Sequence, residues 1–323
     1  VTDYNAQINL TGDNIWENLS RRFNYETGLF TPNRVVGEAS NLANLFEHTE
    51  LANFSPSGKL PSKLFEDAYG VKDTKESLSI SGNFEQAIKH EQKIRSLLNC
   101  VWAGTLDVID TSLSRENNNT MHGNIFVNDF IEWSKKVEKP WAACLNLMDA
   151  HSPYLPDEEH NVWGDEEILL KQGESSFTIS DILTEDTFWS IAPSLRDLYD
   201  GAIRQADSVV KNLIYKLKES NQFDDTLIVV TSDHGEGFGE ESEVSPGTKI
   251  GGHNYGIHEV LTHVPLIVKR PNQNHGKEIH KLATLTNFPE LVISCINNES
   301  EEDKLTEDTV YSMTYRLLDS APT

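Results

Sequence analysis

Blocks of apolar residues separated by polar stretches predict helices and strands in alternation. Residues 141–148, 226–231 and 264–269 are short continuous apolar runs, which are typical of strands covered on both faces. Residues 194–219 carry apolar side chains at near-helical spacing, and a short helix is expected at residues 289–296. This order predicts an α/β fold with a central mixed, mostly parallel sheet and helices on both faces.

The first half of the chain predicts shorter elements. They are a helix at 13–22 with Ile15 and Leu19 inward, a strand at 25–33, a surface loop at 51–75, and helices at 84–98 and 124–136. In the 84–98 helix, the expected apolar positions are Ala87, Ile88, Ile94 and Leu98. In the 194–219 helix they are Leu198, Ile203, Ala206, Val210, Leu213 and Leu217.

Charge narrows the range of partners. The 323 residues include 51 Asp and Glu against 27 Lys and Arg, a net charge of −24. Such an excess opposes binding to nucleic acid or to an anionic membrane, so we expect neither as a partner. Two interpretations stay open: an ordinary acidic cytosolic protein, or a salt-adapted one whose self-repulsion is screened by molar salt. The dispersed acidic residues favour the second, and with it a halophilic archaeal source.

The visible sequence also bears on location. It holds no run of eighteen apolar residues, and its start, Val1 to Gln7, has neither a basic nor an apolar targeting segment. We therefore expect a cytoplasmic protein. Because no Met precedes Val1, we also expect the sequence to begin inside a longer gene product, which leaves export open.

Polar residues that suit a metal follow the 226–231 run. Asp233 and His234 stand at the expected strand end, and Gly235 permits a sharp turn that lets both side chains converge on one cation. A carboxylate suits hard cations, whereas a neutral imidazole suits Mn²⁺, Zn²⁺ or Fe²⁺. The alternative is a polar turn in which Asp233 serves only as a cap.

Histidines are concentrated shortly after this turn. His253, His258 and His263 lie within one predicted loop, helix and strand unit. His253, beside glycines that permit close approach of a ligand, is the best functional candidate of the three. For His258, a role in the site and a structural role are equally supported. His263 is expected to be a core or hydrogen-bonding residue.

Four ordered motifs resemble the sulfatase family of the alkaline phosphatase superfamily. They are Asp149-Ala-His-Ser-Pro-Tyr-Leu-Pro, Leu198-Tyr-Asp-Gly-Ala-Ile-Arg-Gln-Ala-Asp, Thr231-Ser-Asp-His-Gly-Glu, and Gly252-His followed by His263-Val-Pro-Leu-Ile-Val. The resemblance implies a sulfatase-like α/β domain at residues 1–270 and a small, incomplete C-terminal subdomain at 271–323. It also implies that Tyr199, Asp200, Arg204 and Asp207 are mostly architectural.

The resemblance further implies a site. Asp233 and His234 match two metal ligands of the family, and His151 matches a histidine that contacts the sulfuryl or phosphoryl oxygens. His253 falls where the family places a Lys or His that donates to the same anion. The cofactor implied is one divalent cation, Ca²⁺ by family, with Mn²⁺, Mg²⁺ or Zn²⁺ as alternatives. The substrate implied is a small sulfated or phosphorylated molecule.

One part of the family pattern is not found in the sequence. No Cys-x-Pro-x-Arg or Ser-x-Pro-x-Arg segment occurs, so we identify no nucleophile and expect an N-terminal block to be missing. The resemblance then predicts part of a metal-dependent hydrolase of sulfate esters. The alternatives are a phosphate or phosphonate ester hydrolase of the same superfamily and a non-catalytic remnant of the fold.

Overall fold

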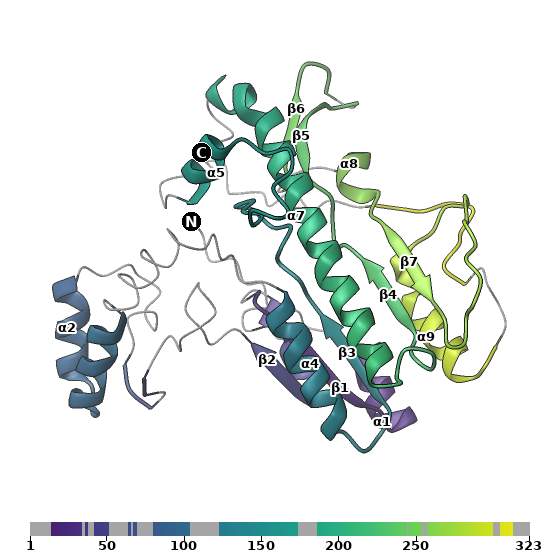
Figure 1. Cartoon of the computed structure of the whole chain (residues 1–323), viewed down its shortest axis with the longest axis horizontal. Helices are drawn as coiled ribbons and strands as arrows, with labels where there is room; N and C mark the ends of the chain where they lie inside the picture. The colour runs from purple at the N-terminus through teal and green to yellow at the C-terminus, as the bar shows by residue number, and fades with distance from the viewer. Residues whose placement is uncertain are drawn as a thin grey trace, which may run out of the picture. The chain divides into compact units, whose positions relative to one another are not determined.

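A computed structural model describes most of the chain (Figure 1). The described residues are 14–33, 36–37, 42–51, 64–65, 67–69, 80–103, 123–173, 186–243, 245–253, 257–299 and 304–312. The chain divides into two compact units, residues 1–163 with 198–212, and residues 164–197 with 213–323. The predicted boundary at residue 270 is not tested by this division and stays a prediction.

A three-stranded parallel sheet forms the centre of the first unit. Strand β1 (Glu26–Thr31) lies between β2 (His48–Leu51) and β3 (Trp141–Leu145) and pairs in parallel with both. Leu29 and Phe30, whose side chains point to opposite faces of β1, are both fully buried. The expected α/β fold with parallel strands is therefore confirmed, and the expected strand at 25–33 is β1.

Helix α4 (Asn124–Lys136) packs along β1 and β3 (Figure 1). Aromatic rings contribute to this contact. The Phe30 ring centroid lies 5.7 Å from that of Phe130 and 5.5 Å from that of Trp133. Gly28 makes this packing possible, because a Cβ there would lie 2.9 Å from Phe30 and 3.1 Å from Trp133. The predicted helix at 124–136 is thus confirmed, and its buried face includes Phe130 and Trp133.

Helix α1 (Ile15–Phe23) also forms where the sequence predicts it, with Ile15 and Leu19 buried. The Asn14 side chain accepts a hydrogen bond from the Glu17 amide and so caps the first turn. Asn24 ends the helix in the left-handed conformation, at φ 58°.

The prediction of one helix at 84–98 is wrong in the extent of the helix and in most of its buried positions. Helix α2 (Ile80–Lys89) ends before a turn, and a second helix covers residues 93–103. Ala87 is fully buried, but Ile88, Ile94 and Leu98 are exposed. The buried face instead carries Ser96 and Asn99, whose side chains bind backbone groups of the preceding segment, including the amides of Tyr69 and Phe65. Hydrogen bonding of that backbone therefore decides which face turns inward.

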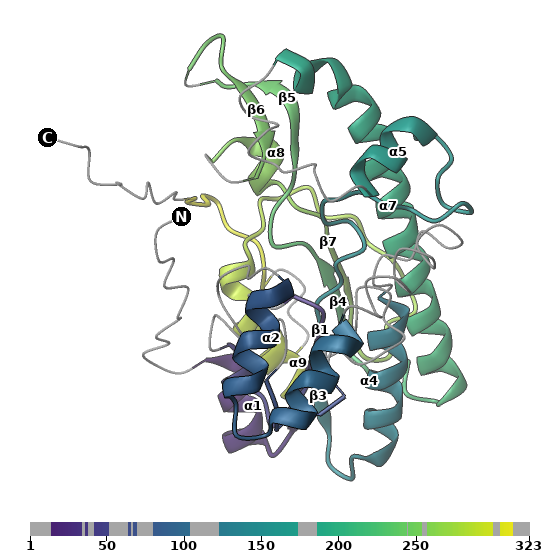
Figure 2. The same cartoon turned by 90° about the vertical axis from the view of Figure 1, so that its left-hand side faces the viewer.

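Helix α7 (Asp186–Glu219) is longer than predicted and is one unbroken helix (Figure 2). Leu198 and Leu217 are buried as expected, whereas Ile203 is exposed. The buried stripe between them runs through Ala202, Gln205 and Val209, at the four- and three-residue steps of a helix face. A sequence search for apolar residues misses it because Gln205 is a buried polar member.

Gln205 is buried because it binds Asp149, the residue that follows the predicted strand 141–148. Gln205 Nε2 donates to Asp149 Oδ1 over 3.2 Å, and Gln205 Oε1 accepts from the Asp157 amide over 2.9 Å. The Asp149 carboxylate also accepts from the Gly123 amide at the start of α4, over 3.0 Å to Oδ2. Asp149 therefore ties the loop after β3 to both helices.

The second unit contains two antiparallel pairs. Strand β4 (Ile228–Thr231) pairs with β7 (Leu266–Lys269), and β5 (Gly237–Glu241) pairs with β6 (Lys249–Gly252). The antiparallel pairing of β4 and β7 departs from a mostly parallel arrangement. The connection between them holds a hairpin and the one-turn helix α8 (Glu259–Thr262) rather than a long crossover helix, which agrees with this pairing.

The other labelled elements of the structure are short helices. They are the helices η2 (Leu42–Leu45), α5 (Glu166–Gly173), η4 (Leu285–Asn287) and α9 (Phe288–Ile296). Helix α9 confirms the helix predicted at 289–296. In the second unit, Lys269 closes the turn between α7 and β4, because its ammonium donates to the backbone oxygens of Asp224 and Thr226 over 2.9 and 3.0 Å.

We predict that Asp149→Ala lowers the free energy of unfolding by about 1–3 kcal/mol, because it leaves the buried Gly123 amide and Gln205 side chain without this acceptor. Chemical denaturation of the variant and of the parent protein measures the difference. The matched control is Asp207→Ala, on the exposed side of α7, which is expected to change little. Equal effects of the two substitutions would contradict a stabilising role for Asp149.

We also predict that Asp129→Asn stabilises the protein at neutral pH. Burial is the largest cause that raises the pKa of Asp129, and the charges of Glu50 and Glu132 raise it further, against His48. A carboxyl group with a raised pKa opposes folding when ionised, so the gain is present at neutral pH and disappears as pH falls below the ordinary value of about 3.9. Denaturation at several pH values, with exposed Glu138→Gln as control, tests the sign.

Candidate metal and ester site

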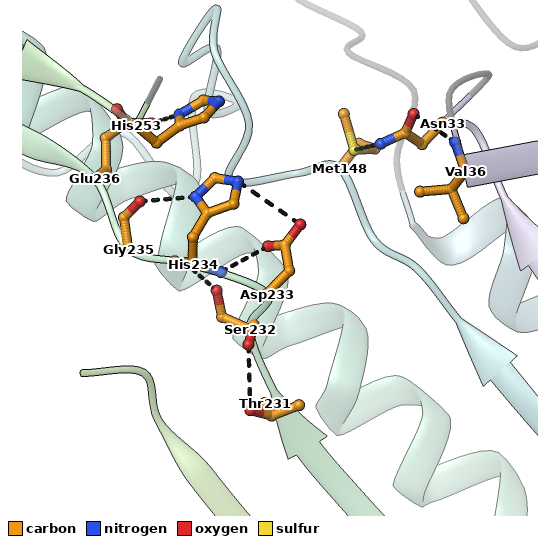
Figure 3. Close-up of polar contacts among 10 residues, drawn as sticks. All are labelled: Asn33, Val36, Met148, Thr231, Ser232, Asp233, His234, Gly235, Glu236 and His253. Atoms are coloured by element: carbon orange, nitrogen blue, oxygen red, sulfur yellow. Dashed lines mark hydrogen bonds and ion pairs between the residues drawn. The ribbon is translucent and has the colours of Figure 1, made fainter. Parts of the chain in front are cut away.

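The candidate site in the second unit begins where β4 ends (Figure 3). Asp233 and His234 occupy the turn that follows the strand, with side chains 78 % and 38 % exposed. The His234 amide donates to Asp233 Oδ1 over 3.0 Å, and the Ser232 hydroxyl donates to the His234 backbone oxygen. These local hydrogen bonds shape the turn, and the side chains of both candidate ligands stay open to solvent.

The geometry of Asp233 and His234 fits a shared cation. Asp233 Oδ2 lies 3.6 Å from His234 Nε2, and two ligands of one ion are roughly 3.0–3.6 Å apart when their bonds to it are about 2.0–2.2 Å. His234 Nδ1 lies 2.8 Å from the backbone oxygen of Gly235 and donates to it. That hydrogen bond places the ring proton on Nδ1, so Nε2 keeps the lone pair that a metal requires.

Gly235 holds this turn against helix α8. Its amide donates to the Leu261 backbone oxygen over 2.9 Å. A Cβ at this position would lie 2.0 Å from the Val260 backbone oxygen, which no real Cβ tolerates. The absence of a side chain at Gly235 therefore allows the turn with the candidate ligands to lie against α8 at this distance.

His253 joins the site from the base of the β5–β6 hairpin, directly after β6. Gly237 and Gly252 face each other at the base of the hairpin, so Glu236 and His253 lie just beyond the two strands. His253 Nδ1 lies 2.9 Å from Glu236 Oε2, and the side chain of Glu236 is only 7 % exposed. The His253 ring stacks on that of His234 at 4.1 Å between centroids (Figure 3).

The charge around His253 favours its protonated form. The hydrogen bond that the His253 ring donates to Glu236 is the largest cause that raises the pKa of His253, and the charges of Glu236 and Asp233 add to it. Burial of the ring acts in the opposite direction but is the weaker influence. A ring in this setting is suited to donate hydrogen bonds to an anion.

Sequence reasoning missed Glu236 as a member of the site. It stands in the Asp-His-Gly-Glu motif, but its partner His253 lies seventeen positions further along the chain. Only the antiparallel register of β5 and β6 brings the two together. The available signal is a pair of glycines, Gly237 and Gly252, each beside one member of the pair.

The other two histidines of this region have contacts of a structural kind. His258 is the N-cap of α8, where its Nδ1 accepts from the Val260 amide over 3.1 Å. A role for His258 in the site stays a prediction. His263 is not a core residue: its side chain is 79 % exposed and lies 3.4 Å from Glu259.

His151 lies in the first unit, in the exposed loop that Asp149 anchors after β3. Its Nδ1 lies 2.5 Å from the Ser152 backbone oxygen. In the same unit the ends of β1 and β3 are joined by the Asn33 amide, which donates to the Met148 sulfur over 3.6 Å (Figure 3). The carboxyl edge of a parallel sheet is where α/β proteins place ligands, which agrees with the expected role of His151.

The helix motif at 198–207 has contacts that fit an architectural role. The Tyr199 ring packs edge-on against Tyr154, with centroids 5.2 Å apart. Arg204 donates to the Glu159 backbone oxygen over 2.9 Å. Both contacts hold the loop that follows His151 against α7.

Within the described part of the chain, no three His, Cys, Asp or Glu side chains gather closely enough to form a metal site on their own. Asp233 and His234 are therefore a pair of candidate ligands rather than a complete set. The described residues also include no helix that is long and apolar enough to cross a membrane.

Comparison with known proteins shows the family. A family model described as Sulfatase matches residues 20–297. The chain belongs to the sulfatase family. Within the alkaline phosphatase superfamily, it is 34 % identical over 88 residues to the multifunctional alkaline phosphatase superfamily protein PehA of Trinickia caryophylli. That match covers 27 % of this chain and 16 % of PehA.

Two solved structures are also similar to this sulfatase-family chain. The protein yidJ from Bacteroides fragilis matches with 23 % identity and a TM-score of 0.41, over 58 % of this chain and 39 % of its own. The phosphonate monoester hydrolase of Agrobacterium radiobacter matches with 17 % identity and a TM-score of 0.40, over 82 % and 54 %. The chain thus spans between a sixth and about half of the length of these proteins.

The family model confirms the predicted family, and the helices and parallel strands of the structure confirm the predicted α/β fold class. The halophilic archaeal source and the missing nucleophile segment receive no support from them and stay predictions. The roles of His151, His253, Asp233 and His234 likewise stay predictions at the level of single residues.

We predict that Gly235→Ala disturbs the candidate site. The new Cβ forces the turn away from α8, so we expect a loss of about 1–3 kcal/mol in the free energy of unfolding and shifted ring resonances of His234. Thermal or chemical denaturation and NMR measure the two effects. The matched control is Gly276→Ala, where a Cβ would meet no atom within 4 Å. An unchanged His234 spectrum would show that the close approach does not set the turn.

Proposed function

We propose that this sulfatase-family chain forms part of a metal-dependent hydrolase of sulfate esters. The observation that carries the proposal is the Asp233–His234 pair, with 3.6 Å between its two candidate ligand atoms and a ring tautomer fixed by Gly235. The sulfatase family match over residues 20–297 supports this reading of the pair. The substrate proposed is a small sulfated molecule.

The donor atoms bear on the choice of cation. The family resemblance favours Ca²⁺, but Ca²⁺ takes oxygen ligands almost throughout, whereas an imidazole nitrogen suits Mn²⁺ or Zn²⁺. When bound, the cation supplies charge that polarises the ester and stabilises an activated nucleophile. We therefore propose one divalent cation, with Mn²⁺ and Zn²⁺ favoured by the described ligands.

Two histidines complete the proposed chemistry. His253 donates from its ring to an oxygen of the sulfuryl group, where negative charge grows during hydrolysis. Its raised pKa supports this role, since a protonated ring is the better donor. For His151, in the first unit, we propose the role that its motif implies by resemblance, which is contact with sulfuryl or phosphoryl oxygens.

Hydrolysis of phosphate or phosphonate esters is the second candidate. It is favoured by the local match to PehA, a protein described as multifunctional within the alkaline phosphatase superfamily. An Asp–His cation site and a histidine donor serve either ester, because both groups present negatively charged oxygens. A non-catalytic remnant of the fold is the third candidate, and it predicts weak metal binding and no turnover.

We predict that Asp233→Ala and His234→Ala each abolish stoichiometric metal binding in the complete protein. Each substitution removes one ligand, and the lost metal removes activity with it. Metal analysis after dialysis, with Mn²⁺, Zn²⁺ and Ca²⁺ offered separately, measures the effect. His263→Ala is the matched control, because this nearby histidine is exposed and outside the pair. Unchanged metal content in either site variant would refute the assignment.

The type of ester is decided by comparing 4-nitrophenyl sulfate with 4-nitrophenyl phosphate and a phosphonate monoester. We expect the sulfate to have the highest kcat/KM with the preferred cation bound. A higher value for phosphate or phosphonate would favour the second candidate. No turnover of any ester by protein that holds its metal would favour the remnant.

A further inference from the structure

We propose that Glu236 is a positioning residue, which fixes the orientation of the His253 ring and makes Nε2 the nitrogen that faces the ester. This inference rests on the proposed function, because it assigns a task to His253 in ester hydrolysis. It adds a residue that does not touch the substrate but determines how His253 does.

The first support is the hydrogen bond itself. His253 Nδ1 lies 2.9 Å from Glu236 Oε2. A carboxylate only accepts, so Nδ1 must carry the proton in both the neutral and the charged ring. Any proton that His253 exchanges with a substrate is then exchanged at Nε2.

The second support is the rigidity of the carboxylate. Glu236 has a side chain only 7 % exposed, and its position is set by the hairpin base, where Gly237 faces Gly252. Gly252, at φ +67°, turns the chain out of β6 towards His253, and a Cβ there would lie 3.5 Å from Glu236 Oε1. A buried carboxylate in such a frame constrains the histidine that it binds.

The third support is the contact between the two rings. His253 stacks on His234 at 4.1 Å, with an angle of 24° between the ring planes. The stack sets the plane of the His253 ring, and the hydrogen bond to Glu236 occupies Nδ1 on one edge of the ring. Nε2 is then the nitrogen left to contact a substrate. Because the ring lies beside the candidate metal ligand His234, we infer that a substrate held by the cation contacts His253 at Nε2.

A purely structural role for Glu236 is the competing explanation. On that view the carboxylate only closes the hairpin, and its loss weakens folding without changing the ring of His253. The hairpin offers a control of this kind. Glu240 accepts from the Phe238 amide over 2.7 Å within the same strand, so Glu240→Gln perturbs the hairpin without touching His253.

The test compares Glu236→Leu, Glu236→Gln and Glu240→Gln in the full protein. NMR of ¹⁵N-labelled histidine in the metal-free protein, at a pH where the His253 ring is neutral, reports which nitrogen carries the proton. His253→Gln assigns the signals. We expect Nδ1–H in the parent protein and in Glu240→Gln, a largely retained Nδ1–H in Glu236→Gln, and a majority of Nε2–H in Glu236→Leu. If Glu236→Leu does not fold, Glu236→Ala takes its place.

Kinetics then test whether this orientation matters for turnover. With metal content equal to that of the parent, we expect Glu236→Leu to lower kcat by about 10–100-fold with little change in KM, and Glu236→Gln to restore most of it. An unchanged tautomer in Glu236→Leu would overturn the positioning role whether or not any ester is hydrolysed, as would an altered tautomer with full kcat. A parent protein that binds metal but hydrolyses no ester would refute the proposed function instead, while the tautomer still reports the effect of Glu236 on the ring.

Discussion

The hydrogen bond between Glu236 and His253 closes the base of the β5–β6 hairpin, and the candidate site depends on this closure. It brings a residue beyond the hairpin back against the turn that carries Asp233 and His234. Without it, His253 would be a surface histidine on a Gly-rich segment. The buried carboxylate of Glu236 thus holds His253, which the pairing of β5 with β6 brings near, beside the other residues of the candidate site.

The first unit uses the same physical device for a different purpose. Asp149 is a buried carboxylate that accepts from the start of α4 and from Gln205 of α7, and it fixes the loop that carries His151. In each unit the carboxylate of an acidic residue near a candidate site residue accepts hydrogen bonds from the protein itself: Asp149 in the first unit and Glu236 in the second. The large acidic excess of the chain therefore has two parts, a solvated majority and a few buried carboxylates that determine structure.

Local pattern predicted most of the elements in this chain. The strands at residues 26–31, 141–145, 228–231 and 266–269 and the helix α4 follow from apolar runs or helical spacing, which depend on neighbouring residues alone. The pairing of β4 with β7 was not predictable in this way, because it depends on how a long connection folds. The inward face of residues 93–103 was misjudged because Ser96 and Asn99 are buried to satisfy backbone groups rather than to exclude water.

In the candidate site, too, the residues that local sequence predicts differ from the residue that depends on strand pairing. Asp233 and His234 are consecutive, so their convergence is local and the sequence predicts it, whereas Glu236 is recognisable only once the hairpin register is known. The family match over residues 20–297 agrees with this local information.

The base and the tip of the β5–β6 hairpin differ in how far their residues are constrained by contacts. Glu236 and His253 are held at its base, while residues 245–248 at its tip are all exposed. Insertions or exchanges at such a tip leave the base register intact. Evolution and protein engineers therefore have a place to graft new recognition loops beside the site, without redesigning the histidine that performs the proposed chemistry.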